Sequence, residues 1–83
     1  KGYWYEPTVL TNVRQDMAIM RNEIFGPVVP VMEFDDFEQG IAYANDTDFG
    51  LAGYLFTNDV HKIMRAVRDM EVGELYINRG AGE

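Results

Sequence analysis

The chain has 83 residues, of which fourteen are acidic and seven basic, so its formal net charge at pH 7 is −7. Surfaces that bind nucleic acid or anionic membranes carry clustered Lys and Arg, so this balance argues against both as partners. The sequence contains no cysteine. This excludes a disulfide, a thiolate metal site and a cysteine nucleophile within these residues. No apolar run approaches the roughly 20 residues that span a bilayer.

The length suits one small domain, and a chain of this size buries only about 60% of its unfolded surface. The sequence opens at Lys1 without a methionine and stops at Glu83, just past an apolar stretch. We therefore expect residues 1–83 to be a segment of a longer protein, called the parent protein below. A trimmed independent domain is the alternative.

The N-terminal part is predicted to be mainly extended. Aromatic and β-branched residues fill positions 3–5 and 7–13, and Pro7, which cannot donate to a strand ladder, interrupts them. Asp16 is expected to cap a short helical turn that carries two methionines, Met17 and Met20.

The stretch 21–27 is predicted to be irregular, and a near-continuous apolar run follows over residues 28–34. A run without alternation indicates a strand buried on both faces, as in parallel sheets. Pro30 lies inside this run and favours a bulge or an edge position.

The first full helix is predicted to begin at Asp35 or Asp36. Asp35 followed by Glu38 resembles a capping box with Asp in place of Ser or Thr. The helix should end within residues 45–48. Its predicted buried stripe, at i, i+4 and i+7, consists of Phe37, Ile41 and Ala44.

A strand over residues 51–57 is expected next, then a second helix capped by Asn58 or Asp59, and a last strand over residues 74–78. Gly73 suits the loop after this helix. The order from residue 28 is β-α-β-α-β, which favours an α/β fold with a mostly parallel sheet and right-handed crossovers. The predicted apolar face of the second helix consists of Val60, Ile63, Met64 and Val67.

The residues best suited to chemistry lie between Asn22 and Val28. The Glu23 carboxylate can accept two hydrogen bonds, which matches the neighbouring hydroxyls of a ribose. The Phe25 ring can form an apolar wall for a flat heterocycle. The following Gly26-Pro27 pair permits a tight turn and stiffens its exit. The alternative is an ordinary surface glutamate beside a core phenylalanine.

The string Glu23-Ile24-Phe25-Gly26-Pro27-Val28, followed by an apolar strand, resembles the aldehyde dehydrogenase superfamily. The likeness continues in order over essentially all 83 residues, although Phe49 replaces the commoner Tyr. The further matching strings are Gly2-Tyr3-Trp4-Tyr5-Glu6-Pro7-Thr8-Val9, Ala44-Asn45-Asp46-Thr47-Asp48-Phe49-Gly50-Leu51, Phe56-Thr57 and Gly73-Glu74-Leu75-Tyr76-Ile77-Asn78.

This resemblance implies a parent protein that oxidises aldehydes to carboxylic acids with NAD or NADP. Glu23 matches the glutamate that holds the nicotinamide ribose, and Phe25 matches the aromatic residue beside that ribose and ring. The family's cysteine nucleophile, its general-base glutamate and its Rossmann-like domain all lie N-terminal to the matching region. The resemblance thus implies that residues 1–83 are a partial C-terminal region of the catalytic domain, inactive alone.

The ending Tyr76-Ile77-Asn78-Arg79-Gly80-Ala81-Gly82-Glu83 is most similar to the lactaldehyde, glycolaldehyde and glyceraldehyde dehydrogenase branch. By this resemblance the loop after Asn78 leads to the substrate entrance, and Arg79 or Glu83 meets a hydroxylated aldehyde. The alternative is a charged loop at a subunit contact. The family also implies a cytoplasmic homo-dimer or homo-tetramer in which this segment packs against the rest of the parent chain.

Other candidates are weaker. His61 lies beside Lys62, off the predicted apolar stripe, and is interpreted as a surface histidine. Asp46 and Asp48 suggest a calcium loop, but their spacing is wrong and Thr57 stands where the closing glutamate belongs, so no metal is expected. An alternative for the whole chain is a free-standing α/β interaction module that keeps the family's shape without its chemistry.

Overall fold

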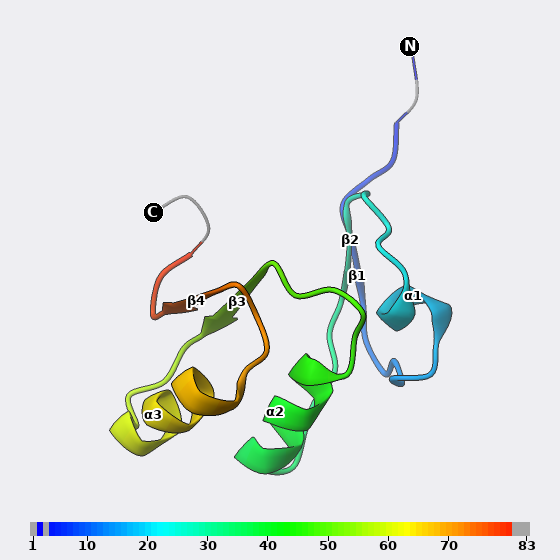
Figure 1. The fold of residues 1–83 in the computed structure, drawn as a ribbon. Coiled ribbons are helices and arrows are strands. Elements are labelled where there is room, and N and C mark those ends of the chain that lie inside the picture. Colours follow the sequence, from blue (N-terminus) through cyan, green and yellow to red (C-terminus); the bar gives the residue numbers. More distant parts are fainter. Residues whose placement is uncertain (1, 3, 81–83) are drawn as a thin grey trace. The chain divides into compact units, whose positions relative to one another are not determined.

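The computed structural model describes residue 2 and residues 4–80, and the chain divides into two compact units, Lys1–Phe34 and Asp35–Glu83. Strands and helices follow one another in both units, and every paired strand is parallel, as the sequence predicted (Figure 1). Among the described residues, the strands form two separate pairs rather than one continuous sheet. None of the helices in this part of the chain is long and apolar enough to cross a membrane.

The first unit is built on a parallel pair of short strands, β1 (Thr8–Leu10) and β2 (Val28–Pro30). The expected strand over residues 28–34 is therefore only three residues long. The last hydrogen bond of the pair lies just beyond Pro30, where the Val31 N–H donates to the Leu10 carbonyl oxygen at 2.7 Å. The prediction of burial on both faces is also wrong, since the Val29 side chain is 56% exposed.

The connection between these strands contains the short helix α1 (Ala18–Arg21). Its N-cap is Met17, without a side-chain hydrogen bond, so the predicted cap at Asp16 is wrong. The Asp16 carboxylate instead accepts a hydrogen bond of 3.3 Å from Arg14 Nε. The predicted extended run also ends early, because Asn12 adopts a left-handed conformation with φ of 57°.

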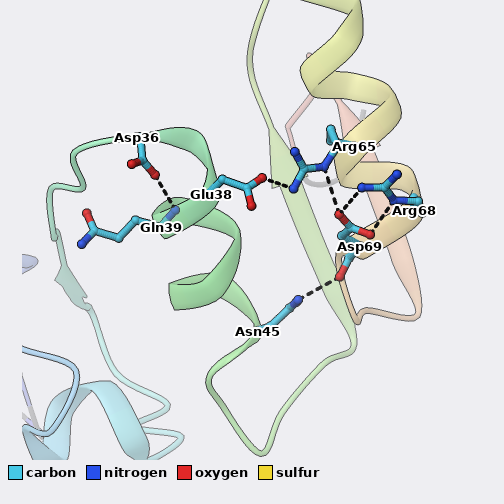
Figure 2. Close-up of polar contacts among 7 residues, drawn as sticks. All are labelled: Asp36, Glu38, Gln39, Asn45, Arg65, Arg68 and Asp69. Carbon is cyan, nitrogen blue, oxygen red and sulfur yellow. Dashed lines mark hydrogen bonds and ion pairs between the residues drawn. The ribbon is translucent and has the colours of Figure 1, made fainter.

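The second unit begins with α2 (Phe37–Asn45), whose N-cap is Asp36. Asp36 Oδ1 accepts the Gln39 N–H at 2.8 Å (Figure 2). Gln39 Oε1 accepts the Asp35 N–H at 2.6 Å. The cap is thus Asp36, with its partner Gln39 one residue later than the Asp35–Glu38 pair predicted, and the Gln39 side chain bonds to Asp35 rather than back to the cap residue. Of the predicted stripe, Ile41 is buried and Phe37 half-buried, whereas Ala44 is exposed.

The helix α3 (Val60–Asp69) begins at the predicted cap, since Asp59 Oδ1 accepts the N–H groups of His61 and Lys62. Its predicted buried face is wrong. Ala66, which lies off that stripe, is the buried residue of α3, because a methyl side chain permits close packing. The predicted stripe is mostly exposed, at 61%, 65% and 62% for Val60, Met64 and Val67.

The helix α3 is the crossover between the parallel strands β3 (Ala52–Leu55) and β4 (Glu74–Ile77). Their register pairs Ala52 with Glu74 and Leu55 with Ile77. The two segments that lead into β3 and β4 lie close together, and the Gly73 N–H donates to the Gly50 carbonyl oxygen at 2.8 Å. A Cβ on Gly50 would lie 2.9 Å from the Glu71 carbonyl oxygen, so a larger residue there requires a shift of the backbone.

Candidate functional site

Glu23 lies in the loop that connects α1 to β2. Its side chain is exposed, and it forms no hydrogen bond or ion pair with any residue in the described part of the chain. An ionised carboxylate without a protein partner keeps all of its acceptor sites for a ligand. The arrangement therefore leaves both carboxylate oxygens of Glu23 without a partner in the described part of the chain, and its role in holding a ribose stays a prediction.

Phe25, two residues later, is unusual in two respects. Its backbone has φ of 55°, in the left-handed region that costs a bulky residue about 1–2 kcal/mol. Its ring is 90% exposed, so the apolar burial of roughly 1.5–3 kcal/mol available to a core phenylalanine is not gained here. A strained backbone at a bulky residue is typical of functional sites, whereas exposure alone does not distinguish Phe25, since Trp4 and Leu51 are 85% and 84% exposed.

The exit from this loop is fixed locally. The Val28 N–H donates to the Gly26 carbonyl oxygen at 2.8 Å, which closes a three-residue turn around Pro27. The same chain then pairs with β1, since the Thr8 N–H donates to the Pro27 carbonyl oxygen at 2.7 Å. The loop that carries Glu23 and Phe25 is thus anchored at its C-terminal end to the first strand pair.

The second predicted group consists of Arg79 and Glu83. Glu83 lies outside the described residues. The Arg79 guanidinium lies over the Tyr76 ring, 5.4 Å from its centroid. The Tyr76 ring in turn stacks on that of Tyr54, its register partner on β3, with centroids 5.1 Å apart and planes at 15°. Sequence reasoning missed this aromatic stack because the two tyrosines are 22 positions apart.

Glu74 orients the Tyr76 ring. The Tyr76 hydroxyl donates to Glu74 Oε1 at 3.0 Å. This hydrogen bond to a nearby carboxylate raises the pKa of Tyr76 above its ordinary value, because it favours the protonated phenol. Tyr76 is therefore held as a neutral hydrogen-bond donor beneath the Arg79 guanidinium.

The two asparagines of the matched motifs join segments that are distant in sequence. Asn45 Nδ2 donates to the Asp69 carbonyl oxygen at 2.8 Å, and Asn45 Oδ1 accepts the Glu71 N–H at 2.9 Å. These bonds tie the end of α2 to the end of α3, and Figure 2 shows the one to Asp69. Asn78 makes a similar pair of bonds to the main chain of Thr57. Asn45 is therefore a structural residue.

A network of charges lies between α2 and α3 (Figure 2). Arg65 pairs with Glu38 and, at 3.1 Å, with Asp69, while Arg68 Nε bonds to Asp69 at 2.8 Å. The hydrogen bonds from Arg68 and Arg65 lower the pKa of Asp69 to about 2. Because each of these charges has a protein partner, the network stabilises the helix pair and offers no free group for catalysis.

A cavity of about 230 Å³ lies where the chain leaves the carboxyl ends of β1 and β2. Neither Glu23 nor Phe25 lines this cavity. The residues that line it are Thr11, Asn12, Val13, Val31, Met32 and Glu33.

Among the described residues, no group of three or more His, Asp or Glu side chains is arranged to hold a metal ion.

A comparison with protein families places the chain. Residues 1–83 match the model of the aldehyde dehydrogenase family over their whole length. The chain belongs to this family. Among curated relatives, it is 49% identical over all 83 residues to a 3,6-anhydro-alpha-L-galactose dehydrogenase of Vibrio sp. strain EJY3. It is also 49% identical, over 95% of its length, to lactaldehyde dehydrogenase of Escherichia coli strain K12.

A third relative is the succinate-semialdehyde dehydrogenase [NADP(+)] 2 of Schizosaccharomyces pombe, with 51% identity over 88% of the chain. The chain spans only about a sixth of the length of these aldehyde dehydrogenases, namely 17%, 16% and 15%.

Solved structures give the same result. A lactaldehyde dehydrogenase structure matches the whole chain with a TM-score of 0.96 and 48% identity, and the chain covers 17% of it. An indole-3-acetaldehyde dehydrogenase structure in complex with NAD⁺ matches 96% of the chain with a TM-score of 0.91 and 38% identity, and 16% of that structure is covered. The fold described above is therefore that of the corresponding part of an aldehyde dehydrogenase.

Proposed function

We propose that the parent protein is an NAD(P)-dependent aldehyde dehydrogenase and that this segment helps to place the nicotinamide half of the coenzyme. The observation that carries the proposal is the loop in which an unpaired Glu23 carboxylate precedes the strained, exposed ring of Phe25. Family membership supports it. One similar structure holds NAD⁺, and one relative's name specifies NADP(+), so both coenzymes are open to the parent.

In this proposal Glu23 accepts hydrogen bonds from the two hydroxyls of the nicotinamide ribose. Phe25 forms an apolar wall beside that ribose and its ring. NAD(P) accepts the hydride when the aldehyde is oxidised to the acid, and water supplies the second oxygen. Hydride transfer requires the reacting carbons to be close and aligned, so the contribution of this segment is orientation.

The segment does not supply the nucleophile, because its sequence contains no cysteine. We place residues 1–83 in the C-terminal part of the catalytic domain, with the nucleophile, the general base and the rest of the coenzyme site on the preceding chain. A cytoplasmic homo-dimer or homo-tetramer is part of the same proposal.

The proposed substrate is a small hydroxyaldehyde such as lactaldehyde. Arg79 supports this choice because its guanidinium forms no hydrogen bond or ion pair with any described residue, which leaves its N–H groups for substrate oxygens. The identity of 49% to the E. coli lactaldehyde dehydrogenase agrees with this substrate class. Glu83 is the second proposed substrate contact.

The test is Glu23→Gln in the parent protein. The amide keeps the shape but loses the charge, so we expect the KM for NAD(P) to rise about tenfold or more and turnover to slow, with Tm unchanged. Glu6→Gln is the matched control, because Glu6 is also exposed and its side chain has no partner in the described chain. An unchanged rate together with an unchanged coenzyme affinity in Glu23→Gln would remove Glu23 from the site.

A further inference from the structure

Hydrogen bonds between the two chain segments continue beyond the carboxyl ends of β3 and β4. The Asn78 N–H still donates to the Leu55 carbonyl oxygen at 2.8 Å, as a strand residue does. The next rung is made by a side chain. Asn78 Oδ1 accepts the Thr57 N–H at 2.9 Å, and Asn78 Nδ2 donates to the Thr57 carbonyl oxygen at 3.0 Å. We call this pair of bonds the Asn78 clamp.

The main chain turns at the same residue, because Asn78 has φ of 57°. Asparagine tolerates this left-handed conformation better than most residues. In a regular strand, residues three positions apart point to opposite faces, so Arg79 should face away from Tyr76. The structure instead holds the Arg79 guanidinium 5.4 Å from the centre of the Tyr76 ring. The turn at Asn78 thus carries Arg79 to the face that bears the stacked tyrosines.

The other side of the clamp is anchored to a helix. Thr57 Oγ1 accepts the Asp59 N–H at 3.1 Å, and Asp59 caps α3 through its carboxylate. The carboxamide of Asn78 therefore fixes the departing chain to both the end of β3 and the start of α3. The two bonds of the clamp join positions that lie 21 residues apart in the sequence.

The carboxyl ends of parallel strands are where open α/β sheets bind their ligands. Arg79 lies at this end of the β3–β4 pair, and its guanidinium has no hydrogen-bond or ion-pair partner among the described residues. Stacking on an aromatic face restrains a guanidinium while its N–H groups, which lie in the plane, stay able to bind oxygen atoms. The geometry is that of an oxygen-binding group held in one orientation.

We propose that Asn78 is a positioning residue, whose clamp on Thr57 holds Arg79 over Tyr76 so that the guanidinium donates to the hydroxyl oxygen of the aldehyde substrate. This inference rests on the proposed function. It assigns to Asn78 a role in substrate selectivity rather than in hydride transfer. We therefore expect a substitution of Asn78 to change the KM for hydroxylated aldehydes only when Arg79 is present.

The experiment is a double-mutant cycle in the parent protein with Asn78→Ala and Arg79→Ala, measured with lactaldehyde and with propanal, which lacks the hydroxyl. We expect Arg79→Ala to raise the KM for lactaldehyde about tenfold, with kcat and the KM for propanal within about twofold of wild type. Asn78→Ala should reproduce this result. The double variant should be no worse than either single variant, because both changes remove the same contact.

Two further variants separate the clamp from the backbone turn. Asn78→Gly keeps the left-handed conformation but removes the carboxamide, so it should still raise the KM for lactaldehyde. Asn78→Asp keeps the acceptor for the Thr57 N–H and should rescue part of the loss. These two also serve if Asn78→Ala does not fold. The matched control is Asn12→Ala, which has the same φ of 57° but a side chain without a partner in the described chain.

The outcomes are distinct. Independent, multiplying effects of Asn78→Ala and Arg79→Ala would overturn the positioning role while the proposed oxidation stands. So would equal losses with lactaldehyde and propanal, or a normal KM in every Asn78 variant. Wild-type parent protein without NAD(P)-dependent aldehyde oxidation would overturn the proposed function itself, and this inference with it.

Discussion

The loop that carries Glu23 and Phe25 differs from the charge network between α2 and α3 in whether its functional groups have protein partners. In the network, Glu38, Arg65, Arg68 and Asp69 are paired with one another. In the loop, a carboxylate without a described partner stands beside an exposed ring on a left-handed backbone. Groups that satisfy one another stabilise a fold, whereas groups left open at an energetic cost are available to a ligand.

The largest expected effect concerns the isolated segment. Pure residues 1–83 should show no NAD(P)-dependent aldehyde oxidation, because the chain has no cysteine to act as the nucleophile. The measurement is NAD(P)H formation at 340 nm with lactaldehyde, at protein concentrations up to the micromolar range. Detectable turnover would show that residues 1–83 contain a complete active site and not only one part of it.

The next effect separates function from stability at Phe25. In the parent protein, Phe25→Ala should lower kcat/KM by about a hundredfold, because the nicotinamide loses a wall of its site. Phe25→Gly should lower it as much, yet raise the free energy of unfolding by about 1 kcal/mol, since glycine accepts a φ of 55° without strain. Steady-state kinetics and urea unfolding measure the two quantities. A loss of stability in Phe25→Gly would mean that the ring packs rather than binds.

A substitution at Asn45, which joins α2 to the end of α3, should lower stability and leave coenzyme binding unchanged. Asn45→Ala removes two hydrogen bonds that join α2 to the end of α3, so the free energy of unfolding should fall by about 2 kcal/mol. The KM for coenzyme should stay within about twofold of wild type. Asn58→Ala is the control, because Asn58 is exposed and its side chain has no partner in the described chain. A raised KM for coenzyme in Asn45→Ala, with a normal free energy of unfolding, would contradict the structural role of Asn45.

The smallest effect is a pH dependence in the network. The hydrogen bonds from Arg68 and Arg65 lower the pKa of Asp69 from 3.8 to about 2. The folded state therefore binds this proton more weakly than the unfolded state, so the stabilisation is complete above pH 3.8 and is lost as the pH falls through about 2. The difference in unfolding free energy between wild type and Asp69→Asn should shrink over this range. A difference independent of pH would show that Asp69 is not paired in solution.

Local signals in the sequence predicted where α2 and α3 begin, but not the cap of α1. Asp36 caps α2 and Asp59 caps α3, and each is one of the two candidates predicted for its position. The capping pair predicted at the start of α2, Asp35 with Glu38, is not formed. Asp36 instead accepts the Gln39 N–H, while Glu38 pairs with Arg65.

Features that depend on distant partners were not predictable. The stripe of Val60, Met64 and Val67 has the spacing of a buried face, but spacing does not show what covers it, and no described residue does. The left-handed turn at Asn78 depends on Thr57, and the parallel pairing of β1 with β2 depends on a connection of 17 residues. The prediction of a coenzyme-binding role for Glu23 and Phe25 rests on residue types and on the resemblance, and it needed no knowledge of the fold.

The most direct test of the central claim is a crystal structure of the parent protein with bound NAD(P). We expect both Glu23 carboxylate oxygens within hydrogen-bond distance of the nicotinamide ribose hydroxyls, with the Phe25 ring against the ribose and the nicotinamide ring. A bound coenzyme whose ribose hydroxyls meet other side chains, with Glu23 directed into solvent, would contradict it.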